Sequence, residues 1–141
     1  MLCREHRREN FFSEPAPGAL EALAALRPRF KLGVVSNAGG GVQGKLVAKG
    51  FGPHLLTVVD SGLEGVEKPD PRIFLRACER LSVSPSRAAY VGDLHAIDVL
   101  GARAAGLEAF LLDPVGAYAE RGLRDVALVP DVASLARLLQ G

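Results

Sequence analysis

Three short segments of the sequence combine residue types that bind phosphate groups and divalent cations. The first is Ser36-Asn37, which follows the apolar run 32–35 and precedes Ala38 and three glycines. A hydroxyl group and unobstructed backbone N–H groups just before a helix N-terminus form a natural phosphate site. Taken alone, a Ser-Asn pair is also ordinary turn chemistry.

The second segment is Glu67-Lys68-Pro69-Asp70-Pro71. Pro69 favours an extended conformation for Lys68, and Asp70 and Pro71 suit the N-cap and first position of a helix. This arrangement would hold the Lys68 ammonium group at a fixed place. Without these neighbours, Lys68 would be interpreted as an exposed loop residue.

The third segment runs from Gly92 to Asp98 and contains two carboxylates. Asp93 ends a predicted strand, and Asp98 lies in the first turns of the next helix. Two hard oxygen ligands with room for water suit Mg²⁺. Alternatively, Asp98 only stabilises the helix N-terminus. We interpret His95 as a polar residue at the rim, because Mg²⁺ prefers oxygen to imidazole nitrogen.

These segments lie on a chain in which short apolar runs alternate with helix-period segments, which predicts an α/β fold with a Rossmann-like parallel sheet and helices on both faces. We expect strands at 31–36, 55–60, 88–93, 109–113 and 126–129, with helices between them. The fourth helix should bury Ile97, Leu100, Gly101, Ala104 and Ala105, and the last should bury Val132, Leu135, Leu138 and Leu139.

Four predicted strands end in a short polar residue, namely Ser36, Asp60, Asp93 and Asp113. Open α/β sheets bind ligands at the carboxyl ends of their strands, so these groups should converge on one edge. For Asp60 and Asp113 we favour a simpler role, the capping of the helices that follow.

The composition excludes several classes of protein. The 141 residues are 48% hydrophobic and 23% charged, with a net charge of +1, which argues against disorder, a dedicated nucleic-acid surface or a polybasic membrane tether. No apolar run approaches the ~20 residues needed to span a bilayer. The two cysteines are too few to cross-link the domain, and Cys78 should be buried, so we expect a cytoplasmic chain. Its expected partner is a small molecule.

The motifs together resemble the haloacid dehalogenase-like (HAD) hydrolase superfamily, in its phosphatase type. LGVVSNAGG is similar to the family's second motif, EKPDPRIF to the third and YVGDLHAIDVLGARAAG to the fourth, in the same order. The resemblance covers nearly all of residues 15–141, which would form the core, whereas 1–14 resemble the remnant of a cap helix and its return linker.

The resemblance implies a role for each site residue and Mg²⁺ as the cofactor. Ser36 and the Asn37 backbone would hold the phosphoryl group of a small phosphorylated molecule, and Lys68 would neutralise nucleophile and phosphate. Asp93 would bind Mg²⁺, and Asp98 would support the metal and its waters. The implied reaction is Mg²⁺-dependent hydrolysis of a phosphomonoester through an aspartyl-phosphate.

One motif of the family is missing. Members begin with a central strand ending in Asp-x-Asp, whose first Asp attacks phosphorus, and no Asp-x-Asp occurs in this sequence. Asp113 ends a strand, but Val115 stands where the second acid would be. We therefore expect this chain to be inactive alone, as part of a longer enzyme or as a non-catalytic module that still binds phosphate and Mg²⁺.

A second alternative belongs to another class of protein. The segment 39–45, from Gly39 to Lys45, fits the G-x-x-x-x-G-K pattern of a P-loop, although Leu46 occupies the position of the Ser or Thr that binds Mg²⁺. This nucleotide-binding hypothesis leaves Ser36-Asn37 and the Lys68 segment unexplained.

The missing strand also affects the fold. In the resembled family it lies between the strands that end at Ser36 and Asp93. Either those strands close up and pair directly, or another segment enters the slot, because buried unpaired backbone groups are costly. The segment could come from residues 1–12, from a second copy through self-association, or from an N-terminal fragment. Residues 1–12 are too charged for a central strand.

Overall fold

Five short parallel strands form the centre of the protein, which we describe from a computed structural model covering residues 18–140. The strands are β1 (Gly33–Ser36), β2 (Thr57–Asp60), β3 (Ala89–Gly92), β4 (Glu108–Leu112) and β5 (Ala127–Val129). All three pairings, β1 with β2, β3 with β4 and β4 with β5, are parallel. The predicted α/β class is confirmed. The predictions for residues 1–14 lie outside the described residues.

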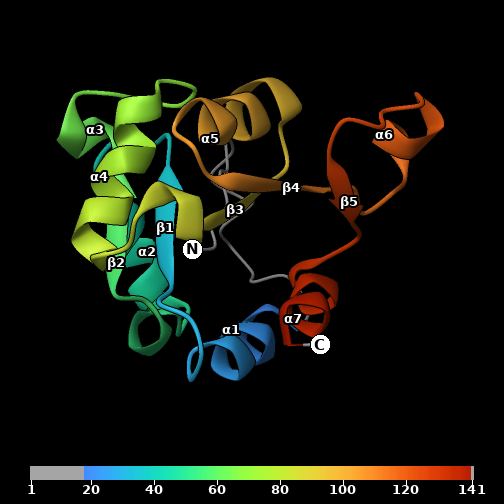
Figure 1. Cartoon of the computed structure of the whole chain (residues 1–141). Helices are drawn as coiled ribbons and strands as arrows, with labels where there is room; N and C mark the ends of the chain where they lie inside the picture. Colours follow the sequence, from blue (N-terminus) through green and yellow to red (C-terminus); the bar gives the residue numbers. More distant parts are fainter. Residues whose placement is uncertain (1–17, 141) are drawn as a thin grey trace.

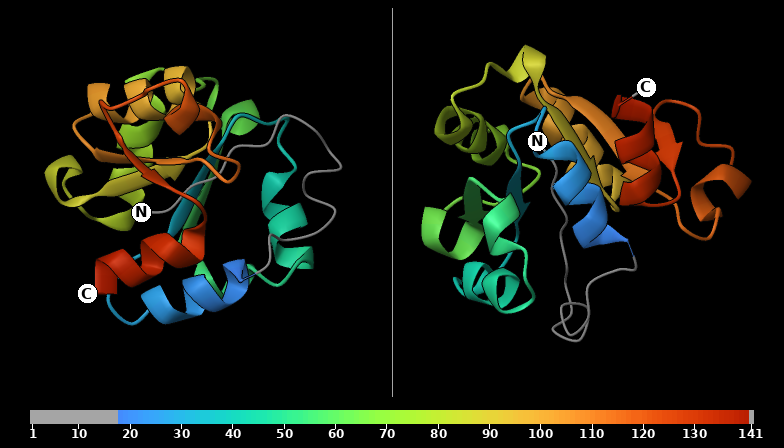
Figure 2. Two further views of the ribbon diagram at one scale, coloured as in Figure 1. Left: turned by 90° about the vertical axis from the view of Figure 1, so that its right-hand side faces the viewer. Right: turned by 90° about the horizontal axis from the view of Figure 1, so that it is seen from below.

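Helices connect the strands and cover both faces, as Figures 1 and 2 show. The α-helices are α1 (Ala19–Leu26), α2 (Val42–Ala48), α3 (Ser61–Glu64), α4 (Pro71–Leu81), α5 (Leu100–Ala104), α6 (Ala117–Glu120) and α7 (Val132–Gln140). Residues 18–140 also contain two 3₁₀ turns and one π-helix, namely η2 (Gly52–His54), η3 (Pro85–Arg87) and the π-helix η4 (His95–Val99). No helix within residues 18–140 is long and apolar enough to cross a membrane.

Successive strand residues point to two separate hydrophobic clusters, as the twofold period of a strand requires. Tyr90 and Leu111 face the cluster under α4 and α5, whereas Val91 and Phe110 face the cluster under α1 and α7. Helices α1 and α7 lie side by side on the second face (Figure 2). Strands β3 and β4 are therefore buried on both sides, as their unbroken apolar sequences predict.

The strands form two sheets rather than one. One sheet contains β1 and β2, the other has the order β3-β4-β5, and no strand pairing joins β1 to β3 within the described residues. One side-chain hydrogen bond joins the two sheets, since the Tyr90 hydroxyl on β3 donates to the Val35 carbonyl on β1 at 3.2 Å. Direct closure of the Ser36 and Asp93 strands, one of the two expected outcomes, does not occur.

Helix α4 follows its predicted pattern. Asp70 is the N-cap and accepts a hydrogen bond from the Arg72 backbone N–H, while Pro71 occupies the first position. The hydrogen bonds of Arg72 also lower the pKa of Asp70. Cys78 is buried as expected, and desolvation raises the pKa of its thiol. This helix fixes the position of the segment just before it, which carries Lys68.

The fourth helix follows its prediction only in part, since Gly101 and Ala105 are buried. Leu100 is 48% exposed and Ala104 is also exposed, whereas Asp98, Val99 and Ala102 are buried. The cause is the π-helical turn η4, which adds one residue to the turn and rotates the buried face. The prediction for Leu138 in the last helix is also wrong, since it is 63% exposed and Ala136 is buried in its place.

Candidate active site

The four polar strand ends lie on one edge of the fold, as predicted. Ser36 and Asp60 are register partners at the last position of β1 and β2. Asp93 follows Gly92 at the end of β3, and Asp113 follows the end of β4. These ends are the carboxyl ends of parallel strands, where α/β sheets bind ligands.

A buried ion pair forms the centre of this edge. The Lys68 Nζ lies 2.8 Å from Asp98 Oδ1, and both side chains are fully buried. The Tyr90 hydroxyl lies 3.0 Å from Lys68 Nζ and 3.3 Å from Asp98 Oδ1. Lys68 is therefore not an exposed loop residue, because its ammonium group is held in place by Asp98 and Tyr90, which come from two different segments.

The second oxygen of Asp98 holds the segment around Asp93. Asp98 Oδ2 accepts hydrogen bonds from the backbone N–H groups of Asp93 at 3.1 Å and Leu94 at 3.0 Å. Lys68 donates to Oδ1, so three donors bind a carboxylate that has about four acceptor positions. The Tyr90 hydroxyl also lies beside Oδ1, but its one proton is shared with the Val35 carbonyl. Asp98 thus interacts with the N-terminus of η4, the simpler of its two expected roles. Its role in metal binding stays a prediction.

Asn37 fixes the backbone at Lys68 from the opposite side. Its Oδ1 accepts from the Lys68 N–H at 2.8 Å, and its Nδ2 donates to the Lys68 carbonyl at 3.0 Å. This reciprocal pair joins two segments that lie far apart in the sequence. The Asn37 side chain is structural here, which leaves the backbone as the part that would contact a phosphate.

The glycine-rich turn after Asn37 is not an unobstructed phosphate cradle. The Ala38 N–H donates to Ser61 Oγ, and the Gly40 and Val42 N–H groups donate to the Asp60 carboxylate at 3.0 and 3.1 Å. Asp60 also caps α3 through the Gly62 N–H at 2.9 Å. The expected capping role of Asp60 is confirmed, and the expectation of unobstructed N–H groups is wrong for these positions.

The same contacts argue against the P-loop hypothesis. The anion that the Gly40 and Val42 N–H groups hold is the protein's own Asp60 carboxylate. Lys45 lies inside α2, which begins at Val42, rather than at the helix start where a P-loop lysine reaches the phosphates.

Ser36 carries the feature most suggestive of a missing ligand. The residue is fully buried, and its Oγ has no hydrogen-bond partner within residues 18–140. Because an unsatisfied buried hydroxyl costs about 1–3 kcal/mol, such an atom in a native structure points to a bound group. A phosphoryl oxygen would satisfy it.

Asp93 is the residue at this edge that the sequence predicts to bind a metal. Within the described part of the chain, no group of three His, Cys, Asp or Glu side chains could hold a metal ion. Mg²⁺ keeps several waters and binds through one or two carboxylates together with phosphate oxygens. The residues present therefore fit Mg²⁺ when a phosphate is bound beside Asp93.

Two other residues have the simpler roles expected of them. His95 Nε2 lies 2.9 Å from Asp125 Oδ2 at the surface, where this hydrogen bond and Arg103 lower the pKa of Asp125. The Asp113 oxygens accept from the Tyr118 and Ala119 N–H groups at 3.1 and 3.0 Å. Asp113 therefore caps α6, and both of its oxygens are engaged.

Gly92 gives a direct test of the packing beneath this site. A Cβ atom at this position would lie 2.3 Å from Asp98 Cγ, so Gly92→Ala must displace the carboxylate that holds Lys68. We expect a loss of about 3 kcal/mol in the free energy of unfolding. Urea denaturation would measure it.

The matched control is Gly44→Ala in α2, where an added Cβ meets nothing within 4 Å. This variant should gain up to about 1 kcal/mol from helix propensity. Equal stability of the two variants would contradict the close contact between Gly92 and Asp98.

The chain is similar to known hydrolases in both sequence and structure. A family model described as haloacid dehalogenase-like hydrolase matches residues 2–106. Phosphoserine phosphatase from Thermus thermophilus is 39% identical over 133 residues, which cover 92% of this chain and 49% of that protein. Haloacid dehalogenase-like hydrolase domain-containing protein 3 from Mus musculus is 41% identical over 96 residues, covering 67% of this chain and 38% of that one.

Among solved structures, a HAD phosphatase from Thermococcus onnurineus superposes with a TM-score of 0.83 at 28% identity, covering 94% of this chain and 62% of that one. The chain spans about half the length of the curated relatives that it matches. Since the family model covers most of the sequence and the phosphatase relatives extend over nearly all of it, the chain belongs to the haloacid dehalogenase-like hydrolases, as a phosphatase-type member.

Proposed function

We propose that this chain carries the phosphate- and Mg²⁺-binding part of a phosphatase that hydrolyses small phosphomonoesters. The observation that carries the proposal is the buried Lys68 ammonium group, fixed by Asp98 and Tyr90 at the strand ends. The Tyr90 hydroxyl also bonds the Val35 carbonyl, directly before Ser36. One hydrogen-bonded network therefore runs from the Ser36 strand through Lys68 to the backbone of Asp93.

In this proposal each residue has a separate role. Ser36 Oγ and the Asn37 backbone bind phosphoryl oxygens, and Lys68 offsets their negative charge as phosphorus is attacked. Asp98 keeps the Lys68 ammonium group and the Asp93 backbone in place. Asp93 would hold Mg²⁺, which when bound supplies further positive charge to the phosphoryl group. Preorganised charges of this kind account for much of the rate of phosphoryl transfer.

The reaction also requires a nucleophile that this sequence does not contain. In the proposed route a carboxylate oxygen bonds to phosphorus while the bond to the substrate's alcohol oxygen breaks, and that oxygen takes a proton. Water then attacks phosphorus and releases the carboxylate and inorganic phosphate. No Asp-x-Asp occurs in the sequence, and Asp113 is engaged with α6.

We therefore expect the isolated chain to show no phosphatase activity of its own. The measurement is Mg²⁺-dependent release of phosphate from a small phosphomonoester, with the Lys68→Ala variant as control for contaminating phosphatases. Equal rates near background are the expected result. A Lys68-dependent rate well above background would contradict the proposal, and Asp113 would be the first residue to test as the nucleophile.

A related prediction concerns the coupling of the two ligands. Because Asp93 alone is a poor Mg²⁺ site, bound phosphate should strengthen Mg²⁺ binding about tenfold, and Mg²⁺ should strengthen phosphate binding by the same factor. Calorimetric titrations of each ligand with and without the other would measure both factors. Independent binding would mean that the two ligands do not share this site.

The second candidate function is a non-catalytic module that binds phosphate and Mg²⁺. It is favoured by the same absence of Asp-x-Asp beside three matching motifs. The genomic sequence upstream of Met1 would distinguish the phosphatase from the non-catalytic module. An in-frame strand segment ending in Asp-x-Asp would support the enzyme, and its absence would support the module. We favour the enzyme, with a small phosphorylated molecule rather than nucleic acid or a membrane as partner, in the cytoplasm.

A further inference from the structure

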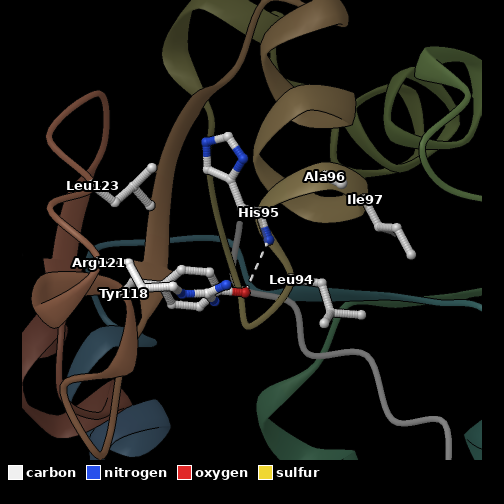
Figure 3. Close-up of a pocket in the computed structure, with 7 residues that line it drawn as sticks. All are labelled: Leu94, His95, Ala96, Ile97, Tyr118, Arg121 and Leu123. Atoms are coloured by element: carbon white, nitrogen blue, oxygen red, sulfur yellow. Dashed lines mark hydrogen bonds between the residues drawn. The ribbon is translucent and has the colours of Figure 1, made fainter.

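The backbone of residues 93–95 is held from two sides. On the inner side, Asp98 accepts the N–H groups of Asp93 and Leu94. On the outer side is a pocket of about 420 Å³ lined by Leu94, His95, Ala96, Ile97, Tyr118, Arg121 and Leu123 (Figure 3). In this pocket the Tyr118 hydroxyl donates to the Asp93 carbonyl at 3.1 Å and accepts from the His95 N–H at 3.4 Å.

The Tyr118 hydroxyl therefore donates its one proton and accepts one hydrogen bond within the same short stretch of backbone. Its two partners, Asp93 and His95, are the residues on either side of Leu94. Removing the hydroxyl would take away the partner of both the Asp93 carbonyl and the His95 N–H, while Asp98 would still accept from the Asp93 and Leu94 N–H groups. Tyr118 thus holds the outer side of the backbone turn that determines the position of the Asp93 carboxylate.

Tyr118 is itself held in place. Its own N–H and that of Ala119 are capped by Asp113, which fixes the start of α6 at the end of β4. On the other side, the Arg121 guanidinium lies over the ring, 5.1 Å from its centroid. Figure 3 shows the ring and Arg121 stacked, with the hydroxyl pointing at the backbone of His95. The phenol is therefore a fixed support rather than a mobile surface group.

We propose that Tyr118 is a positioning residue for Asp93, and that through the backbone of residues 93–95 it sets the affinity of this edge for Mg²⁺. This inference rests on the proposed function. It assigns a role to α6 and to the Asp113 cap, which no motif of the sequence indicated. Lys68 is held by Asn37, Asp98 and Tyr90 rather than by Tyr118.

The test is Tyr118→Phe in the 141-residue chain, followed by NMR of backbone amides. Mg²⁺ is titrated in the presence of inorganic phosphate, and phosphate is titrated without Mg²⁺. We expect Mg²⁺ binding, read at the Asp93 amide, to weaken about fivefold to tenfold. Phosphate affinity without Mg²⁺ should not change. A general loss of structure would weaken both, so the difference between the titrations identifies positioning.

The matched control is Leu123→Val, which alters the same pocket but removes no hydrogen bond to the 93–95 backbone, and it should leave both affinities unchanged. Hydrogen exchange of the His95 amide gives a metal-free measurement and should become at least about fivefold faster in Tyr118→Phe. Equal Mg²⁺ affinities, or unchanged His95 exchange, would overturn the role of Tyr118 alone. A wild-type chain that binds no Mg²⁺ with phosphate would overturn the proposed metal site as well.

Discussion

Replacing Lys68 by methionine should lower the free energy of unfolding by about 3–5 kcal/mol, because it leaves the fully buried Asp98 carboxylate without its counter-charge. The same change should abolish phosphate binding. Asp98→Asn should cost a similar amount for the opposite reason, since it leaves the ammonium group buried and unpaired. Urea denaturation would give the stabilities and calorimetry the phosphate affinity.

The double variant Lys68→Met with Asp98→Asn separates stability from function. With both charges removed, the asparagine oxygen can still accept from the Asp93 or Leu94 N–H, so much of the lost stability should return. Phosphate binding should not return, because the cation is gone. Recovery of both stability and phosphate binding in the double variant would mean that Lys68 has only a structural role.

If the single variants do not fold, Tyr90→Phe gives a milder measure of the same network. The Tyr90 hydroxyl contacts Lys68, Asp98 and the Val35 carbonyl. Its removal should cost about 1–2 kcal/mol and weaken phosphate binding without abolishing it. No change in either quantity would contradict the network.

The sequence was sufficient to predict the features that depend on local residue patterns. Alternation of apolar runs with helical segments predicted the α/β fold, and Asp70-Pro71 predicted the start of α4. The polar residues at strand ends were predicted to share one edge, because the carboxyl ends of parallel strands lie together. Capping by Asp60 and Asp113 followed from the short carboxylates that precede helices.

Long-range contacts could not be predicted in this way. The burial of Lys68 depends on Tyr90 and Asp98, which lie 22 and 30 residues away. The backbone N–H groups around the glycine turn at 39–41 were expected to be unobstructed. Nothing nearby in the sequence shows that the Asp60 carboxylate, at the end of β2, accepts hydrogen bonds from them. In both cases the hydrogen-bond partner reaches its position through tertiary packing, which local residue propensities do not predict.

The two tyrosines were missed for a related reason. Each lies in a context that suggests packing, Tyr90 inside an apolar strand and Tyr118 in a short helix. The available signal was chemical: a buried phenol must find a hydrogen-bond partner. It indicates that a partner exists, but not which one. The π-helical turn η4 had no signal of this kind, and its extra residue misplaced the buried face of the following helix.

A large effect on both stability and activity should come from supplying the strand that the family places between β1 and β3. These strands do not pair with each other within the described residues. Near their amino-terminal ends lies a pocket of about 250 Å³, with Leu32 before β1 and Ala88 before β3 among its lining residues. A parallel strand between them would place its C-terminal carboxylates on the edge that carries Ser36, Lys68 and Asp93.

We therefore expect an apolar peptide ending in Asp-x-Asp to stabilise the chain, and the chain without it to be weakly stable or self-associating. Binding to the folded state alone adds about 2.7 kcal/mol when the peptide is present at 100 times its Kd. The urea midpoint should rise with peptide concentration, and sedimentation should show dissociation to a complex of one chain and one peptide.

The matched control is the same peptide ending in Asn-x-Asn. Both peptides should stabilise the chain, because pairing uses the backbone, whereas only the aspartate peptide can supply the nucleophile. Mg²⁺-dependent phosphatase activity should therefore appear with Asp-x-Asp and not with Asn-x-Asn, and it should be lost in the Lys68→Ala chain. A monomer with a sharp unfolding transition that neither peptide shifts would show that the two sheets need no further strand. Stabilisation by both peptides without activity from either would leave the sheet completed and favour the non-catalytic module over the enzyme.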